Sequence, residues 1–267
     1  MSRAKIIIQY VSDLHLEFLS VAKVQSLLDH IIPKTDICVL AGDIGYPFAE
    51  TYTLFLKGIN KKFKNILLIH GNHEYYQLKE NKGKTMNEII NKTRNIIQEN
   101  RLDNIHFLHN SHYDIKNYRF IGSTLWTYIY DPKYVVNDAY NIGEFTVENN
   151  NNNHSISKEF LKLSIEQCQT ENKTPIVITH HIPSFTLTHP KYKEFHLYSQ
   201  CYSSACDDLV SPPVKCWIYG HTHTPMVKII NNIPCICNPI GYSNENESNE
   251  IDYNRYIVID GEEDENI

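Results

Sequence analysis

Five segments of the chain place metal-binding or proton-transferring side chains directly after an apolar run. These side chains are Asp13 and His15, Asp43, Asn72 and His73, His180 and His181, and His221 and His223. Carboxylate oxygens, amide oxygens and imidazole nitrogens can all bind a metal ion, and imidazole can also move a proton. Residues i and i+2 of an extended chain lie on the same face, so the two members of a D-x-H or H-x-H pair can converge. One such pair is often accidental, but five segments together predict a metal centre.

The apolar runs before these segments are predicted to be buried strands, which must bring the side chains together. They cover residues 5–11, 36–40, 65–70, 175–179 and 215–219. Gly71 follows the third run and allows the chain to turn sharply, so the next side chains stand at the carboxyl end of that strand. In open α/β sheets, ligands bind at the carboxyl ends of the strands. We therefore expect the five segments to meet at one edge of a sheet.

The rest of the chain alternates between helical and extended patterns. Apolar spacing predicts an amphipathic helix over residues 20–32, and Pro33 ends it. Because early strands alternate with helices and later strands form hairpins, we expect an α/β fold in which helices cover a mixed sheet system. Further helices are expected near 49–61, 85–99 and 156–169, and further strands at 105–108, 118–123, 226–230, 233–237 and 255–260.

Length and composition predict a single domain over residues 1–267. The chain is 42% hydrophobic, enough to bury one core, and it shows no repeated period and no Pro- or Ser-rich linker. The five consecutive asparagines, Asn149–Asn153, predict a flexible surface loop near 148–154. The net charge of −6 is the sum of −8 on an acidic tail that begins at residue 245 and +2 on the rest of the chain. The remainder is nearly neutral and has no basic stripe, which argues against a nucleic-acid partner.

The ends of the chain and its cysteines predict an intracellular, cytoplasmic location. No apolar run approaches 18 residues, so no membrane span is expected. The N-terminus passes directly into a predicted strand without a secretory signal peptide. The seven cysteines are odd in number and scattered, which favours reduced thiols over a disulfide framework.

The order and types of the five motifs resemble the calcineurin-like metallophosphoesterase superfamily. The corresponding segments are D-x-H at 13–15, G-D at 42–43, G-N-H-E at 71–74, the strand-end His180, and G-H-x-H at 220–223. Segments 122–127, 179–184 and 238–242 are also similar to a small bacterial-type branch of this superfamily. That branch commonly has arginine where this chain has Ile240, so any anion contact of that arginine is missing.

This resemblance implies a four-layer α/β/β/α sandwich with two metal ions at one edge. Mixed nitrogen and oxygen ligands suit Mn, Fe, Zn or Ni better than Ca or Mg. Two such ions about 3.5–4 Å apart can generate a bridging hydroxide for direct attack on phosphorus. The implied ligands form two sets that share Asp43 as a bridge: Asp13, His15, Asp43 and His223 for one ion, and Asp43, Asn72, His180 and His221 for the other.

His73 matches the catalytic histidine of this superfamily. We expect it to transfer a proton to the leaving group or to bind the phosphoryl oxygen, with a purely orienting role as the alternative. His181 is expected either to support a ligand or to contact substrate. Tyr46 fits the G-D-x-x-Y of purple acid phosphatases, in which the tyrosine binds iron. Because His15 is present and should occupy that position, Tyr46 is not expected to be a ligand.

The sequence thus predicts a metal-dependent phosphoester hydrolase that acts on a small phosphoester. Substrate contacts are expected from Trp126 and Lys191, and from the segments 128–145 and 182–200. The metal centre suits monoesters and diesters equally; a small phosphodiesterase is favoured over a serine/threonine protein phosphatase, and a nuclease ranks below both. The alternative from another class is a non-catalytic metal-binding scaffold. A scaffold predicts loss of a ligand or of His73, and the chain retains them all.

Overall fold

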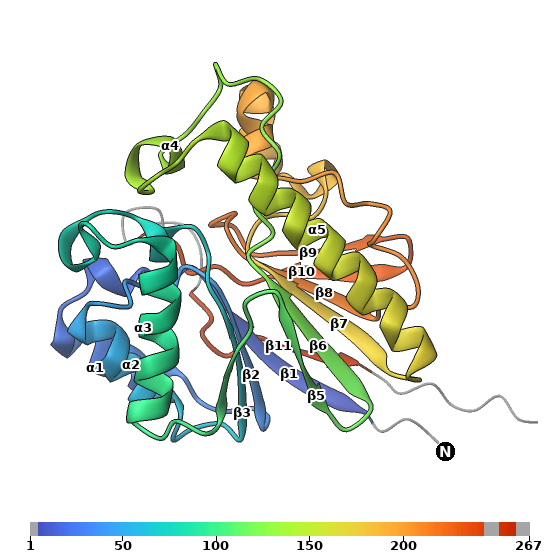
Figure 1. Cartoon of the computed structure of the whole chain (residues 1–267). Coiled ribbons are helices and arrows are strands. Elements are labelled where there is room, and N and C mark those ends of the chain that lie inside the picture. The colour runs from blue at the N-terminus through green and yellow to red at the C-terminus, as the bar shows by residue number, and fades with distance from the viewer. Residues whose placement is uncertain (1–4, 243–250, 260–267) are drawn as a thin grey trace, which may run out of the picture.

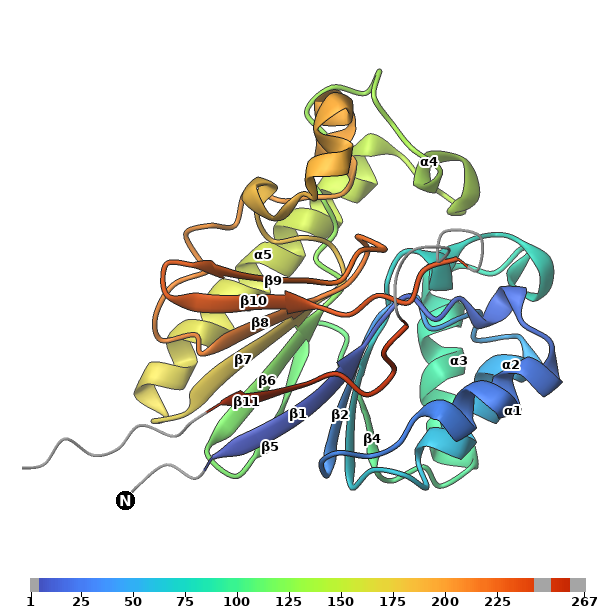
Figure 2. The same ribbon diagram turned by 180° about the vertical axis from the view of Figure 1, so that it is seen from behind.

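The computed structural model describes residues 5–242 and 251–259, including the side chains of all of these except residues 191–196. The described strands form two mixed sheets that pack face to face, with helices on the outer face of each (Figure 1). Turning the molecule by 180° shows the same layers from behind (Figure 2). The predicted four-layer α/β/β/α sandwich is therefore confirmed. The acidic tail that begins at residue 245 lies largely outside the described residues.

The first sheet has the strand order β11-β1-β2-β3-β4. Neighbours from β1 to β4 are parallel, whereas β11 joins the edge antiparallel to β1. The bounds are β1 (Ile6–Val11), β2 (Ile37–Ala41), β3 (Asn65–Ile69), β4 (Ile105–Phe107) and β11 (Tyr256–Ile259).

The second sheet has the strand order β5-β6-β7-β8-β10-β9. Its four inner strands are parallel, and the two edge strands are each antiparallel to their neighbour. The edge strand β5 lies outside every predicted strand, because it is half-buried and lacks a long apolar run. The bounds are β5 (Ser111–Ile115), β6 (Tyr118–Ser123), β7 (Thr174–Thr179), β8 (Cys216–Tyr219), β9 (Met226–Ile230) and β10 (Ile233–Cys237).

Side chains alternate between the two faces of each strand, so the strands contribute to three separate cores. One lies between the two sheets, and the other two lie between each sheet and the helices that cover it. In β2, Val39 faces the second sheet, whereas Cys38 and Leu40 face the helices. The inter-sheet core also takes Phe120 from β6 and Ile178 from β7. Because the inner strands are buried on both faces, they appear in the sequence as continuous apolar runs.

Helices complete the outer layers and follow the predicted amphipathic pattern. The first sheet is covered by α1 (Val21–His30), α2 (Glu50–Ile59) and α3 (Met86–Glu99). Thr85 and Glu88 form a capping box that fixes the start of α3. The second sheet is covered by α5 (Val147–Thr170), and a short helix, α4 (Asp138–Asn141), lies above the sandwich. Single-turn or longer 3₁₀ helices cover Leu16–Phe18, His73–Tyr75, Lys79–Asn81, Phe185–Leu187 and Pro190–Cys201.

The prediction of a flexible asparagine loop near 148–154 is wrong, because these residues form the first turns of α5. The Thr146 hydroxyl caps the helix by accepting from the Asn149 N–H at 3.0 Å. Asn150 Nδ2 donates to the Thr127 carbonyl at 2.7 Å, and Asn151 exchanges two hydrogen bonds with the backbone of Ile129. The run therefore contributes amide groups that satisfy the backbone of a neighbouring loop. Low complexity alone does not reveal those partners.

All seven cysteines are buried, and none forms a disulfide in the described structure. This agrees with the expectation of reduced thiols, and buried thiols of this kind pack as small apolar groups. Among the described residues, the structure contains no helix with the length and apolar character that a bilayer crossing requires.

Replacing Asn150 tests the role assigned to the asparagine run. Asn150→Ala removes a buried hydrogen bond and leaves the Thr127 carbonyl without its donor. The free energy of unfolding should fall by ~1–2 kcal/mol, even though alanine has the better helix propensity. Asn152→Ala is the matched control, since Asn152 is exposed, and it should be neutral or slightly stabilising in urea denaturation. Equal destabilisation by both substitutions would contradict this assignment.

Candidate metal centre

The strands β1, β2, β3, β7 and β8 end at the same edge of the sandwich, and the predicted ligands meet there. Three groups bring ligand atoms within 4.8 Å of one another: Asp13 with His15 and His223, Asp43 with His15 and His73, and Asp43 with His180 and His221. Asn72 joins the third group, because its Oδ1 lies 3.0 Å from His180 Nε2. The structure thus brings together all seven predicted ligands. Asp43 and the proton-transfer candidate His73 lie side by side in the second group.

Left-handed backbone at the strand ends turns these side chains inward. The φ angles are 55° at Asp13, 48° at His15, 52° at Asp43, 69° at His221 and 46° at His223. Non-glycine residues adopt this conformation uncommonly, and it persists where surrounding contacts enforce it. Such contacts are present: the Asp13 N–H donates to the Gly42 carbonyl at 3.0 Å, and the His15 N–H donates to the Asp43 carbonyl at 3.0 Å.

Two motif glycines are required by close approach to the ligands. A Cβ at Gly71 would lie 2.2 Å from Asp43 Oδ1, and a Cβ at Gly42 would lie 2.5 Å from His180 Nδ1. Gly42 also has a φ of 86°, which favours glycine. The G-D and G-N-H-E motifs therefore begin with glycine because the metal centre leaves no room for a side chain.

Glu74, the last residue of G-N-H-E, fastens the loops after β2 and β3 to each other. Its buried carboxylate accepts from the N–H groups of Gly71 at 2.7 Å, Ile44 at 2.7 Å and Asp43 at 3.1 Å. These donors are the backbone groups left without strand partners where the two strands end. Glu74 thereby fixes the distance between Asp43 and Asn72.

The first ligand group presents two imidazole nitrogens to each other. His15 Nε2 lies 3.0 Å from His223 Nε2, and His223 Nε2 lies 3.4 Å from Asp13 Oδ1. His15 Nδ1 donates to the buried Glu17 carboxylate at 3.1 Å, which leaves the Nε2 lone pair directed at the group. Nitrogen and carboxylate lone pairs repel one another unless a cation or a proton lies between them. The arrangement fits a metal ion.

The third group has the same character. His180 Nδ1 donates to the Ala41 carbonyl at 2.9 Å, so its Nε2 faces Asn72 Oδ1 at 3.0 Å and Asp43 Oδ2 at 3.3 Å. His221 Nδ1 lies 3.2 Å from the same nitrogen. Burial alone would lower the pKa of His180, yet the Asp43 carboxylate raises that pKa to about 9. The field at this position therefore favours a positive charge, which a divalent cation would supply.

Both ring nitrogens of His73 have a hydrogen-bonding partner. Its Nδ1 donates to Glu17 at 3.1 Å, its Nε2 lies 3.0 Å from the Tyr242 hydroxyl, and its ring stacks on Tyr76 with centroids 4.1 Å apart. Burial would lower the pKa of His73, but the carboxylates of Asp43 and Glu17 outweigh it and raise this pKa above the ordinary value. His73 is thus suited to hold a proton beside the metal ligands.

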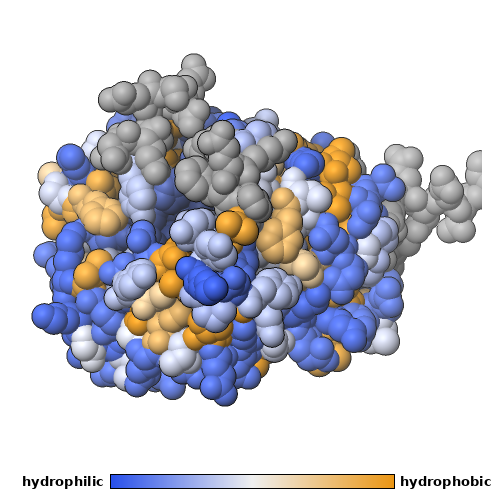
Figure 3. Space-filling model, turned by 90° about the horizontal axis from the view of Figure 1, so that it is seen from above, coloured by the Kyte–Doolittle hydropathy of each residue, from blue (hydrophilic) through white to orange (hydrophobic). Residues whose placement is uncertain are grey.

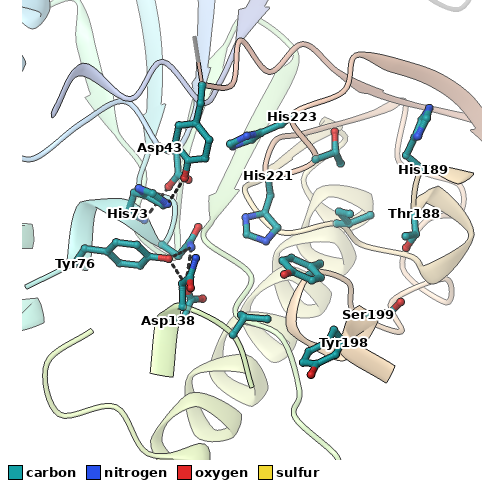
Figure 4. A pocket seen from close by; sticks show the side chains of 17 residues that line it. Asp43, His73, Tyr76, Asp138, Thr188, His189, Tyr198, Ser199, His221 and His223 are labelled. Carbon is teal, nitrogen blue, oxygen red and sulfur yellow. Dashed lines mark hydrogen bonds between the residues drawn. The ribbon is translucent and has the colours of Figure 1, made fainter. Parts of the chain in front are cut away.

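A pocket of about 360 Å³ opens beside the three ligand groups. Both segments predicted to shape the substrate site border it: residues 136–138 belong to segment 128–145, and Thr188, His189, Tyr198 and Ser199 belong to segment 182–200. Asp43, His73, Tyr76 and Asp138 line one side of the pocket (Figure 4). Seen from above, the face around this edge mixes polar and apolar residues rather than forming one apolar patch (Figure 3).

Three single residues were expected at or near the substrate. Two of them, Trp126 and His181, are buried away from the pocket. Trp126 is 5% exposed and packs against Tyr75 and His181, behind the ligands rather than in the pocket. His181 is fully buried, with its Nδ1 3.2 Å from the Thr124 carbonyl and its ring against His221. Burial, together with the neighbouring His180, lowers the pKa of His181 to about 3, so the ring is neutral. The side chain of Lys191 is not among those described.

Two further sequence expectations concern core positions. Tyr46 is 1% exposed and packs in an apolar cluster with Ala49 and Tyr75. Ile240 is buried in the core between the first sheet and its helices. The position that carries arginine in the bacterial-type branch is therefore apolar and filled by packing here.

Comparison with known proteins identifies the family. The family model of the calcineurin-like phosphoesterases matches residues 8–225. The chain belongs to this family. An uncharacterized protein, L509, of Acanthamoeba polyphaga mimivirus is 30% identical over 280 residues, which covers 95% of this chain and 96% of the viral protein.

One solved structure shares the fold of this chain along nearly its whole length. It is the phosphopantetheinyl hydrolase of Mycobacterium tuberculosis, with a TM-score of 0.68 and 13% sequence identity, covering 95% of this chain and 96% of the other. At that identity, the likeness concerns the fold. The calcineurin-like family is metal-dependent, in agreement with the clustered aspartates and histidines.

Several residues that hold this phosphoesterase site together received no role from the sequence. Glu17 follows the D-x-H motif by two residues, Glu74 closes G-N-H-E, and Tyr242 closes N-P-x-G-Y, so their positions in or next to motifs were available signals. Tyr76 and Asp138 carry no such signal, because their contacts are formed only when segment 128–145 folds over the loop after β3.

Glu74 offers a test of how the loops are fixed. In Glu74→Gln, one carboxylate oxygen becomes an amide NH₂ that faces backbone N–H groups, so at least one buried donor loses its acceptor. The free energy of unfolding should fall by ~1–3 kcal/mol in urea denaturation. Glu80→Gln is the matched control, because Glu80 is exposed. Unchanged stability in Glu74→Gln would show that the loops are held by other contacts.

Proposed function

We propose that the chain is a hydrolase of small phosphoesters that uses a two-metal centre. The observation that carries the proposal is that three ligand groups meet beside a pocket and that Asp43 belongs to two of them. Membership of the calcineurin-like phosphoesterases supports the reaction class. The two-metal arrangement and the substrate go beyond that membership.

The ligand groups indicate which residues would hold each ion. Asp43 belongs to one ligand group with His15 and to another with His180, so its carboxylate would be shared by both ions. Because the set is rich in nitrogen, Mn, Fe, Zn or Ni fits better than Ca or Mg. One ion would be held by Asp13, His15, Asp43 and His223, and the other by Asp43, Asn72, His180 and His221.

The chain's own residues supply orientation and a proton. When bound, two cations lower the pKa of a water molecule and neutralise charge that develops on the attacking and leaving oxygens. Glu17 accepts from His73 Nδ1, so it turns His73 Nε2 toward the pocket. From there, His73 can give its proton to the leaving oxygen or bind a phosphoryl oxygen. Water attacks phosphorus directly, without a covalent bond to the enzyme.

The pocket supports a small organic group on the phosphate. Its volume of about 360 Å³ is in the range of small-molecule sites. Tyrosines 76, 198, 202 and 242 contribute to its wall, and aromatic side chains of this kind offer both an apolar face and a hydroxyl. We propose a small phosphoester, rather than a nucleic acid, as the substrate. The unpaired, buried thiols fit action in a reducing compartment such as the cytoplasm.

Hydrolysis of two model esters tests the proposal. After treatment with a chelator and addition of manganese, the wild-type chain should hydrolyse p-nitrophenyl phosphate, bis-p-nitrophenyl phosphate or both. His73→Ala should lower the rate by about 10²–10⁴-fold, because the proton donor is lost. Asp43→Asn should lower it at least as far, because both ion sites lose a shared carboxylate.

Exposed residues of the same types provide the controls. His112→Ala and Asp103→Asn alter solvent-facing side chains and should leave both rates unchanged. The ratio of the two substrates distinguishes monoester from diester preference. Equal rates in the wild type, His73→Ala and Asp43→Asn would overturn the enzymatic proposal and favour a metal-binding scaffold.

A further inference from the structure

Asp138 is a buried carboxylate on the pocket wall that contacts a candidate metal ligand. It begins α4 and is 7% exposed. Its Oδ1 accepts two hydrogen bonds, one from Asn72 Nδ2 at 2.7 Å and one from the Tyr76 hydroxyl at 2.7 Å. Figure 4 shows Asp138 and Tyr76 next to each other on the side of the pocket that also carries His73 and Asp43.

The contact decides which end of the Asn72 amide faces the metal ligands. An amide has an oxygen that accepts and an NH₂ group that donates, and the two ends have nearly the same shape. With the NH₂ group toward Asp138, the oxygen faces His180 Nε2 at 3.0 Å. If the amide turned over, its oxygen would face the Asp138 carboxylate, and NH₂, which is no metal ligand, would occupy the metal side. A carboxylate at 138 excludes that alternative.

Asp138 belongs to residues 131–142, a segment of the pocket wall that is anchored at both ends. On one side, Tyr76 pairs with Ile142 in an isolated antiparallel bridge next to α4. On the other side, Gln200 donates to the carbonyls of Asp131 at 2.8 Å and Tyr134 at 3.1 Å. The segment that forms part of the pocket wall is therefore also the segment that holds a metal ligand.

A second link runs through Tyr76. Its hydroxyl donates to Asp138, and its ring stacks on His73. The same carboxylate oxygen thus touches the side chain of one candidate metal ligand and the aromatic partner of the candidate proton donor.

We propose that Asp138 is a positioning residue, which fixes the Asn72 amide with its oxygen toward the metal and ties the pocket wall to the metal centre. The inference rests on the proposed function in one respect, namely that Asn72 binds a metal ion. In this role Asp138 acts through Asn72 rather than as a ligand itself. Its substitution should change metal affinity through Asn72 alone.

Metal titration of matched variants tests this. Manganese affinity is measured by calorimetry or by competition with a chromophoric chelator, independently of activity. Asp138→Ala should weaken the binding of one of the two ions by about 10–100-fold, the usual effect of removing the partner of a metal ligand. Asp138→Asn keeps an oxygen that can accept from Asn72 but also brings an NH₂ group that can donate to a turned Asn72 amide, so its metal affinity should lie between those of Asp138→Ala and the wild type.

Two further variants separate positioning from general disruption. Tyr76→Phe removes a hydroxyl that donates to the same Asp138 oxygen and that accepts from Asn72 Nδ2 at 3.3 Å, but it keeps the 2.7 Å bond from Asn72 to Asp138. Its loss of metal affinity should therefore be smaller than that of Asp138→Ala. In an Asn72→Ala background, Asp138→Ala should cause no additional loss, because the ligand through which it acts is absent. Asp138→Ser, which is too short to reach Asn72, is measured in parallel in case Asp138→Ala does not fold.

Hydrogen exchange reports on the pocket wall. Manganese should slow amide exchange over residues 131–142 in the wild type and in Asp138→Asn, and should have no such effect in Asp138→Ala or Asp138→Ser. The positioning role would be overturned if Asp138→Ala and Asp138→Ser both bound manganese with wild-type affinity. It would also be overturned if Asp138→Ala lowered the affinity equally in the wild-type and Asn72→Ala backgrounds. Either result would leave the proposed function intact. If the wild type bound no metal at all, the proposed function would fail, and this inference with it.

Discussion

The structure depends on a concentration of lone pairs at the edge where two sheets meet. Imidazole nitrogens, an amide oxygen and two carboxylates face one another at about hydrogen-bond distance, and their outward nitrogens already donate to Glu17 and to the Ala41 carbonyl. Without a cation or protons, this arrangement is repulsive and costly to bury. The surrounding fold must therefore supply enough rigidity to keep the ligands together. A metal ion among these lone pairs would remove the repulsion, in agreement with the metal dependence of the family.

That rigidity comes from backbone contacts between strand ends. The left-handed residues after β1, β2 and β8 keep their conformation because each loop is bonded to the next, and Glu74 joins the loops after β2 and β3. The glycines at 42 and 71 permit a closeness that any side chain would prevent. Three apolar cores behind the site hold the strands in register. The sandwich thus acts as a rigid base, on which the pocket walls formed by segments 128–145 and 182–200 are placed.

A feature could be predicted from the sequence where a local residue pattern directly reflects the contacts made in the fold. Buried parallel strands keep continuous apolar runs, and each candidate ligand follows such a run directly, so the strands, their carboxyl ends and the meeting of the seven candidate ligands there were predictable. Prediction failed where partners are distant in the chain. The amides of Asn150 and Asn151 are satisfied by residues 127–129, which no composition rule reveals, and the contact of Asp138 with Asn72 spans 66 positions. Trp126 was expected to contact substrate, yet its ring packs against His181 behind the candidate ligands.

Anomalous X-ray diffraction from crystals grown with manganese or zinc would show whether two metal ions share Asp43. We expect two peaks about 3.5–4 Å apart, one beside Asp13, His15 and His223, and the other beside Asn72, His180 and His221. Asp43 should lie between them. A map without peaks at these positions, or with a single peak that Asp43 does not touch, would rule out a shared two-metal centre.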